Sequence, residues 1–229
     1  MCIAIVLPLV SYFIVKTVSE DAVVVPKRFF YDSVDNKVVN GKTVTDTIWH
    51  SVANIELVNQ LGDTVSLDDM QGNIIIADFF FTRCPSICPT LTKNMKELQD
   101  ALKIKDARRR IDVSYVRFLS FSVDPERDSV EALKKYADRF AVNHDTWWLL
   151  TGDKKKIYDF AIDELKLGVQ DGEGVDTNFI HSQKFVLIDR DRVVRGYYDG
   201  LDSNSLSKLV EDLTILMLEK DRKKKRKFF

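Results

Sequence analysis

The stretch ADFFFTRCPSICPTLTKNM, residues 77–95, decides how the rest of this sequence is interpreted. It continues a strand-like apolar run, NIIIADFFF (73–81), and leads into LTKNMKELQDALK, whose apolar residues recur at helical spacing. Between them, Cys84 and Cys88 stand four positions apart, and each is followed by a proline. The stretch therefore predicts a strand buried on both faces, a loop that carries a dithiol, and then a helix.

The prolines indicate where this helix begins relative to the thiols. Pro89 disfavours helical conformation at Cys88 and suits a first helical turn, so we expect the helix to begin near Pro89 with Cys88 at its N-cap. Unpaired N–H groups and the helix dipole stabilise a thiolate there and lower the pKa of a cysteine. We therefore predict a reactive dithiol, although two cysteines can also be close only because they pack in a core.

Composition places the chain among globular proteins with one main domain. Its 229 residues are 45% hydrophobic, which is enough to bury a full core. The net charge of -1 gives no overall attraction to nucleic acid. Three cysteines are too few for a disulfide framework, so we expect one dithiol with a chemical role.

The remaining patterns alternate between strands and helices. Gly62 and Asp63 separate two short strands and predict a hairpin at the start of the domain. Further strands are predicted in IDVSYVRFLSFSVD and TWWLLTG, and a later hairpin turns at Asp189 to Asp191. Helices are predicted at about 129–140, 153–162 and 203–218. This order predicts an α/β fold with a mixed central sheet that helices cover on both faces, and with an N-terminal hairpin extension.

The two ends of the chain differ from this domain. Residues 1–16 are almost wholly apolar but shorter than the roughly 20 residues that span a bilayer, and we interpret them as a membrane anchor or signal-like segment rather than a buried element. Residues 17–47 form a polar tether with an Asn-Gly turn signal between short β-prone runs, and 48–219 form the domain. The basic tail 220–229 is either a solvated helix end or a site for anionic lipid head groups.

Three histidines are available as further metal ligands. His50 and His144 are expected to make local hydrogen bonds. His181 lies in a polar loop that leads into a strand, and this loop approaches the dithiol if that strand neighbours the 73–81 strand. Two thiolates and one imidazole suit Cu(I) or Cu(II), whereas structural zinc normally takes four protein ligands. Asp124, in VDPERD, is interpreted as a turn and helix-entry residue.

With these motifs in place, the sequence resembles the Sco/SenC family, thioredoxin-like copper proteins involved in assembling cytochrome c oxidase. The resemblance rests on FFFTRCPSICPTLTKNM, FSVDPERDS and FIHSQKFVLIDRDRVVRGYYDG, and it covers about Asn54 to Leu218. It implies a thioredoxin-like fold and copper ligands at Cys84, Cys88 and His181.

The resemblance also implies a role and a place in the cell. The role is a copper chaperone for the dinuclear copper centre of cytochrome c oxidase subunit II, a reductase for the cysteines of that centre, or both. Other copper chaperones or thiol-disulfide reductants are further expected partners. The family also implies an N-terminal membrane anchor that holds the domain on the extracytoplasmic side.

Two other classes of protein remain open at this point. A thioredoxin-like peroxidase would place a reactive cysteine at a helix start without needing His181. A thiol-disulfide oxidoreductase would use the same dithiol, although such enzymes more often have two residues between their cysteines than three. Either class would act without a physiological metal.

Overall fold

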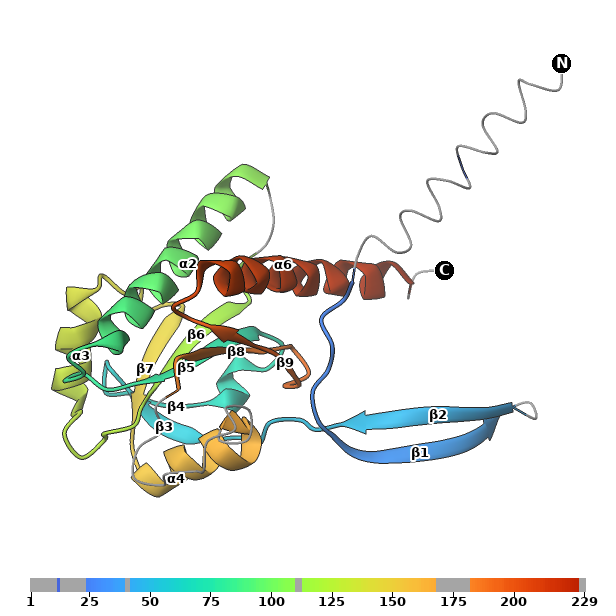
Figure 1. Ribbon diagram of the computed structural model, residues 1–229, viewed down its shortest axis with the longest axis horizontal. Helices are drawn as coiled ribbons and strands as arrows, with labels where there is room; N and C mark the ends of the chain where they lie inside the picture. Colours follow the sequence, from blue (N-terminus) through green and yellow to red (C-terminus); the bar gives the residue numbers. More distant parts are fainter. Residues whose placement is uncertain (1–11, 13–23, 40–41, 110–112, 168–181, 227–229) are drawn as a thin grey trace, which may run out of the picture.

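The computed structural model describes residues 12, 24–39, 42–109, 113–167 and 182–226 (Figure 1). Most of the predicted anchor, residues 1–16, and the predicted ligand His181 lie outside these ranges. Among the described residues, no helix combines the length and apolar character that crossing a bilayer requires.

A seven-stranded mixed sheet forms the centre of the protein, in the order β4-β3-β7-β6-β5-β8-β9. The three middle strands β5, β6 and β7 run parallel to one another, and the remaining neighbours pair antiparallel. The strands are β3 (Glu56–Asn59), β4 (Thr64–Ser66), β5 (Ile74–Phe80), β6 (Val116–Ser122), β7 (Trp147–Thr151), β8 (Lys184–Ile188) and β9 (Val194–Asp199).

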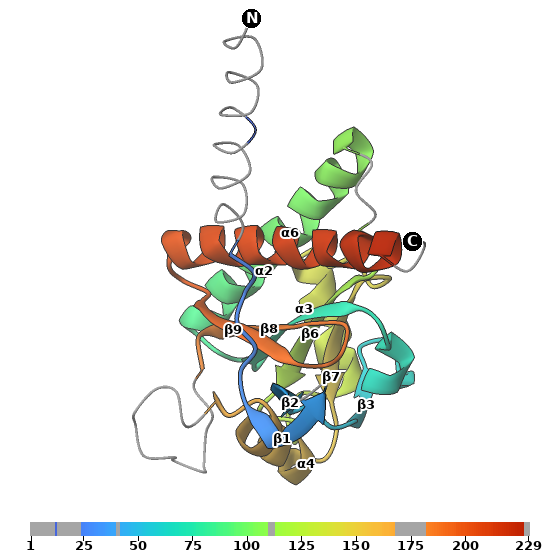
Figure 2. The same cartoon turned by 90° about the vertical axis from the view of Figure 1, so that its right-hand side faces the viewer.

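Helices cover both faces of this sheet, so two apolar layers form (Figures 1 and 2). One face packs against α2 (Ile87–Arg109), α3 (Val130–Arg139) and α6 (Ser203–Arg226). The other packs against the 3-10 turn Leu67–Met70, α4 (Lys154–Asp159) and the π-helical turn Phe160–Glu164. The predicted α/β fold with a doubly covered mixed sheet is confirmed.

Strand β5 shows why this sheet forms from these residues. Every residue of β5 is buried, as its apolar run, interrupted only by Asp78, predicts. Ile74, Ile76 and Phe80 face one apolar layer, while Ile75, Ala77 and Phe79 face the other. The predicted core positions of the following helix are also buried; they are Leu91, Met95, Leu98 and Leu102.

Three details differ from the sequence-based expectations. Helix α2 begins at Ile87, so Cys88 lies inside its first turn rather than at the N-cap. Pro89 is compatible with this start because the N–H groups of the first turn donate to no intrahelical acceptor, so the N–H that proline lacks is not needed there. Helix α6 continues to Arg226, into the basic tail. The predicted tether contains a two-stranded ribbon, β1 (Tyr31–Val39) and β2 (Lys42–Trp49).

A buried arginine fixes the chain that leads into this ribbon. Arg195 on β9 is 4% exposed and donates from Nε and Nη2 to the carbonyl oxygen of Pro26, at 3.1 and 2.6 Å. Its Nη1 donates to Asp189 at 2.7 Å. The backbone N–H of Phe29 donates to the carbonyl oxygen of Val194 at 2.9 Å. The segment before the ribbon is therefore held along β9.

Candidate functional site

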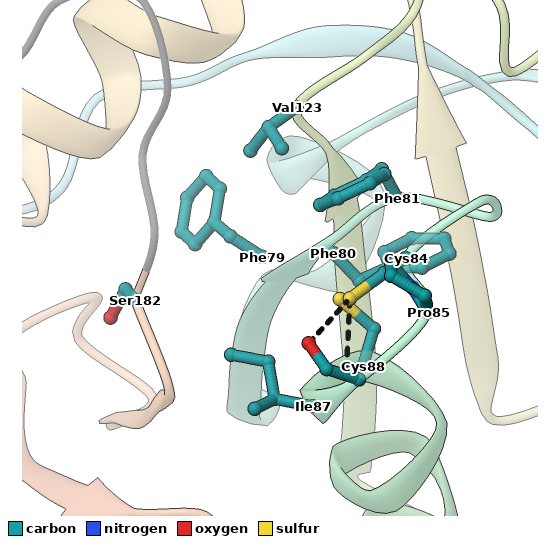
Figure 3. A pocket seen from close by; sticks show the side chains of 10 residues that line it. Phe79, Phe80, Phe81, Cys84, Pro85, Ile87, Cys88, Val123 and Ser182 are labelled. Carbon is teal, nitrogen blue, oxygen red and sulfur yellow. Dashed lines mark hydrogen bonds between the residues drawn. The ribbon is translucent and has the colours of Figure 1, made fainter.

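The strand directions bring three distant parts of the chain to one end of the sheet. Strand β5 is parallel to β6 and antiparallel to β8, so the ends of β5 and β6 lie beside the start of β8. Strand β8 is therefore a neighbour of the 73–81 strand, which is the condition under which the loop before β8 approaches the dithiol. A cavity of about 160 Å³ opens there, and its lining comes from all three parts. The lining residues are Phe79, Phe80, Phe81, Cys84, Pro85, Ser86, Ile87, Cys88, Val123 and Ser182 (Figure 3).

The two predicted thiols lie together in this cavity. Cys84 and Cys88 are both free and buried, at 8% and 3% exposure. The backbone N–H of Cys88 donates to Cys84 Sγ at 3.4 Å, and Ser86 Oγ lies 3.9 Å from the same sulfur (Figure 3). The loop therefore gathers its donors around the sulfur of Cys84.

This asymmetry separates the pKa values of the thiols. Burial raises the pKa of Cys84, but hydrogen bonds from the Cys88 thiol, the Cys88 backbone and Ser86 outweigh it, so the net pKa is lowered. Burial raises the pKa of Cys88 to about 12, and the bond to Cys84 adds to the rise. The predicted lowering at the helix start thus applies to Cys84 and is wrong for Cys88. Cys84 is therefore the more acidic thiol of the pair.

A buried carboxylate that the sequence analysis did not single out holds the cysteine loop in place. Asp128 is fully buried and accepts hydrogen bonds from the backbone N–H and hydroxyl of Thr82, at 3.1 and 2.5 Å. It also accepts from Ser122 Oγ at 2.5 Å. Thr82 lies two residues before Cys84, and Ser122 is the last residue of β6. Asp128 therefore links the cysteine loop to the end of β6. Its signal in the sequence was the third acid of VDPERD.

Asp124, the first acid of that motif, has the predicted structural role. Its backbone carbonyl accepts hydrogen bonds from the N–H groups of Arg127 and Asp128, both at 3.0 Å. Its carboxylate lies 3.6 Å from the exposed Arg127 guanidinium. Asp124 therefore forms the turn that leads into α3, as interpreted from the sequence.

A second buried carboxylate, Asp78, lies on the same face of β5 as Ile76 and Phe80, toward the layer that contains the cysteines. It is 1% exposed, and neither carboxylate oxygen has a hydrogen-bond partner of good geometry. Burial raises its pKa from 3.8 to about 7, and the hydroxyl of Ser120, opposite it on β6, offsets only part of the rise. Asp78 is therefore held largely protonated below neutral pH.

Of the three histidines, His50 and His144 lie in the part of the chain that the structure describes. His50 contacts Asp32 and Glu164, at 2.8 and 3.1 Å. His144 contacts Gln60 at 2.9 Å. The Glu164 and Gln60 partners are far from these histidines in the sequence, and neither histidine lines the cavity. Its wall includes Ser182, the residue after His181.

A mixed sheet whose central strand leads through a dithiol loop into a helix defines the class of thioredoxin-like thiol proteins. Comparison with known proteins gives the family. The SCO1/SenC family model matches residues 49–217, and the chain belongs to this family.

Individual relatives agree with this assignment. The chain is 36% identical over 174 residues to the SCO1 protein homolog of Bacillus subtilis, covering 76% of this chain and 86% of the relative. The solved structure of BsSco, described as a Sco family protein of cytochrome c oxidase assembly with a disulfide switch, matches with 36% identity, 73% and 94% coverage and a TM-score of 0.61. A SCO1/SenC lipoprotein from Bacillus anthracis matches with 31% identity, 73% and 95% coverage and a TM-score of 0.62. The thioredoxin-like fold is therefore confirmed.

The pKa difference predicts which thiol reacts first. In the reduced protein at pH 7, iodoacetamide should modify Cys84 at least about tenfold faster than Cys88, because alkylation requires the thiolate. Timed labelling followed by peptide mass mapping measures both rates and separates them from Cys2. In a Cys84→Ser variant, Cys88 should stay slow to react. Equal rates, or faster labelling of Cys88, would contradict the assignment of Cys84 as the more acidic thiol.

Asp78 predicts a pH-dependent cost to stability. Its folded pKa of about 7 exceeds 3.8, so from pH 4 to 7 the unfolded chain releases the proton first and the free energy of unfolding falls. Above pH 7 the cost levels off at up to about 4 kcal/mol. Relative to wild type, Asp78→Asn should therefore gain stability between pH 4.5 and pH 8, measured by urea unfolding. A difference between the two proteins that is independent of pH would refute this role.

Asp128 predicts a large effect from a small change. Asp128→Asn keeps the size of the side chain but leaves one of three donors facing an amide N–H, which should lower the free energy of unfolding by about 2–4 kcal/mol. Asp124→Asn is the matched control, since the Asp124 carboxylate has one ion pair, at 3.6 Å to the mostly exposed Arg127 guanidinium, and such a pair contributes less than about 1 kcal/mol. Chemical denaturation measures both variants. Similar losses in the two would show that Asp128 does not hold the loop.

Proposed function

We propose that this protein binds one copper ion through Cys84, Cys88 and His181 and delivers it during cytochrome c oxidase assembly. The supporting observation is that the dithiol and Ser182 line the same cavity. His181 is the residue before Ser182, and consecutive Cα atoms are about 3.8 Å apart, which supports an imidazole as the third ligand. The order of β5 and β8 in the sheet supports the same assignment.

The chemistry of these donors supports copper as the ion. Thiolate sulfur is a soft ligand that suits Cu(I), and a set of two thiolates and one imidazole also holds Cu(II). The cavity of about 160 Å³ is smaller than the roughly 300–1,000 Å³ that organic ligands occupy, which favours an ion over an organic substrate. Since the pKa of Cys88 is about 12, copper must displace its proton, and binding becomes tighter as pH rises.

Copper is the cargo of this proposal, and its acceptor is the dinuclear copper centre of oxidase subunit II. A site with three protein ligands leaves a coordination position at which an incoming thiolate binds before the original ligands leave. The BsSco protein, 36% identical to this chain, is described as a member of a cytochrome c oxidase assembly family. Another copper chaperone would load the site in the same way.

The dithiol also supports reduction of the acceptor's cysteines. In this step the Cys84 thiolate attacks a partner disulfide, forms a mixed disulfide and releases one partner thiolate. Cys88 then loses its proton and attacks Cys84 Sγ, which releases the second partner thiolate and leaves a Cys84–Cys88 disulfide. Two electrons pass to the partner, and a thiol-disulfide reductant restores the dithiol. The pKa difference between the thiols favours this order of attack.

For the location of the protein, we propose that residues 1–16 anchor the domain at the extracytoplasmic face of a membrane. The apolar character of this segment supports an anchor. The Bacillus anthracis relative is described as a lipoprotein, which is a membrane-attached form.

Copper loading of the reduced protein without oxygen tests the proposed site. X-ray absorption should show one copper bound by sulfur and nitrogen, and Cys84→Ser or Cys88→Ser should abolish tight binding. His181→Ala should remove the nitrogen signal and weaken binding more than about 100-fold, because even outer-shell partners contribute 10- to 100-fold. The control His144→Ala, a histidine bonded elsewhere, should leave both the spectrum and the affinity unchanged.

The same variants separate the alternatives. If His181→Ala binds copper as wild type does and disulfide exchange continues, the protein is a thiol-disulfide oxidoreductase without a physiological metal. Rapid consumption of hydrogen peroxide by the reduced protein would instead indicate a peroxidase. Transfer of copper to an isolated dinuclear copper domain of subunit II would support delivery, and failure of this transfer from a loaded protein would contradict it.

A further inference from the structure

The chain that precedes the ribbon of β1 and β2 lies along β9, the last strand in the order of the central sheet (Figure 1). The backbone N–H of Phe29 donates to the carbonyl oxygen of Val194, and the Phe29 ring meets the Tyr197 ring edge-on, with 5.5 Å between their centroids. The Arg28 guanidinium lies 3.7 Å from the Asp191 carboxylate. Backbone and side-chain contacts therefore both attach this segment to the sheet.

A buried guanidinium strengthens this attachment. Arg195 directs both Nε and Nη2 to the carbonyl oxygen of Pro26, and its Nη1 contacts Asp189 at 2.7 Å and Glu219 of α6 at 3.6 Å. The Arg195 side chain is 3% exposed, and Pro26 is buried as well. If Pro26 moved away, two donors of a buried cation would lose their acceptor, which is costly. The contact of Arg195 with Pro26, here called the clamp, therefore holds residue 26 on the body of the protein.

The ribbon of β1 and β2 leaves the body of the protein and returns to it at the same place (Figures 1 and 2). The backbone N–H of His50, after β2, donates to the carbonyl oxygen of Phe30, before β1, at 3.1 Å. Two residues later, the N–H of Val52 donates to the carbonyl oxygen of Arg192 at 2.9 Å. Both ends of the ribbon are therefore fixed, and its residues add nothing to the distance that the chain before the domain can span.

These attachments shorten the tether that the sequence predicted at residues 17–47. A tether of about 31 residues spans roughly 100 Å when it is extended. With the clamp in place, the tether between the proposed anchor, residues 1–16, and the body of the protein consists of residues 17–25. About nine residues reach at most about 30 Å. The clamp therefore reduces the reach of the domain about threefold.

The clamp and the dithiol lie at opposite ends of the central sheet. Val194, beside Arg195, pairs with Ile188, and Ile188 pairs with Ile75 near the start of β5. The dithiol loop instead follows Phe80, the last residue of β5. Because a strand rises about 3.3 Å per residue, the two ends of β5 are about 20 Å apart. The tether therefore leaves the body of the protein about one strand length from the thiols.

We propose that Arg195 is a positioning residue that limits how far the dithiol can move from the membrane. This inference rests on the proposed anchor at residues 1–16. The tether and the length of one strand together confine the thiols to within about 50 Å of the membrane surface. A short tether raises the effective concentration of the dithiol for a thiol or copper site that is held at the same membrane, and gives no such advantage toward a partner in solution. The partner that this arrangement fits is therefore a membrane-attached protein.

Hydrogen exchange of the full chain tests the clamp itself. Arg195→Lys keeps the charge but loses the two donors that share Pro26, so the backbone amide of Phe29 should exchange at least about tenfold faster, while the amides of β5 stay protected. The matched control is Arg192→Lys at the same end of the sheet; Arg192 bonds to Asp68, and its replacement should leave exchange at Phe29 unchanged. Unchanged exchange at Phe29 in Arg195→Lys would overturn the proposal.

Matched insertions test the reach with Arg195 in place. About 20 flexible Gly/Ser residues are inserted either between residues 23 and 24 or in the turn between β1 and β2, in the full chain held in vesicles of phosphatidylcholine and phosphatidylglycerol. The measurement is the rate at which lipid-tethered iodoacetamide modifies Cys84, divided by the rate with free iodoacetamide. The first insertion should lower this ratio about sixfold, because effective concentration falls with about the −3/2 power of tether length. The insertion in the turn should leave the ratio unchanged.

The outcomes separate this proposal from the proposed copper site. Equal effects of the two insertions would show that the ribbon is part of the tether and would overturn the proposal, as would no effect of either insertion. A full chain that does not attach to vesicles would also overturn it, whereas copper binding by the same sample would stay unchanged. Loss of copper binding with the expected ratios would instead contradict the copper site and support the clamp.

Discussion

Strand β5 pairs in parallel with β6 and antiparallel with β8, and the candidate site depends on these two opposite directions. A parallel partner ends where β5 ends, and an antiparallel partner begins there. The dithiol loop, Val123 and Ser182 meet for this reason, although they are far apart in the sequence. If β8 ran parallel to β5, Ser182 would lie at the far end of the sheet. The directions of the strands therefore determine which side chains can act together.

Much of the fold could be predicted from the sequence, because it rests on local patterns. The largely apolar run of β5 and the helical spacing of apolar residues in α2 both predict burial directly. The buried positions in α2 are Leu91, Met95, Leu98 and Leu102. The two-stranded ribbon of β1 and β2 was less predictable. Its Asn-Gly signal indicated a turn, but nothing local distinguishes a polar tether from a polar ribbon that is fixed at its base by distant residues such as Asp191 and Glu164.

The dithiol could be located from the sequence, but its electrostatics could not. The pKa values of Cys84 and Cys88 depend on which sulfur receives the loop's hydrogen bonds, and in the folded chain the backbone N–H of Cys88 donates to Cys84. Asp128 was not predicted to hold the cysteine loop, because a carboxylate after Asp-Pro usually marks a helix entry. Only the folded chain shows it beside Thr82. Likewise, the sequence shows that Asp78 lies in an apolar run, but only the folded structure shows that its buried carboxylate oxygens have no hydrogen-bond partner.

The pairing of β8 with β5 also determines when the cavity can form during synthesis of the chain. The cysteines are synthesised well before β8, and the pairing of β8 with β5 closes a loop of more than a hundred residues in the chain. Contacts of such long range form late in folding. A chain that is still emerging therefore carries two cysteines without the wall that Ser182 provides. The cavity becomes complete only when the C-terminal third has arrived, so synthesis and site formation are separated in time.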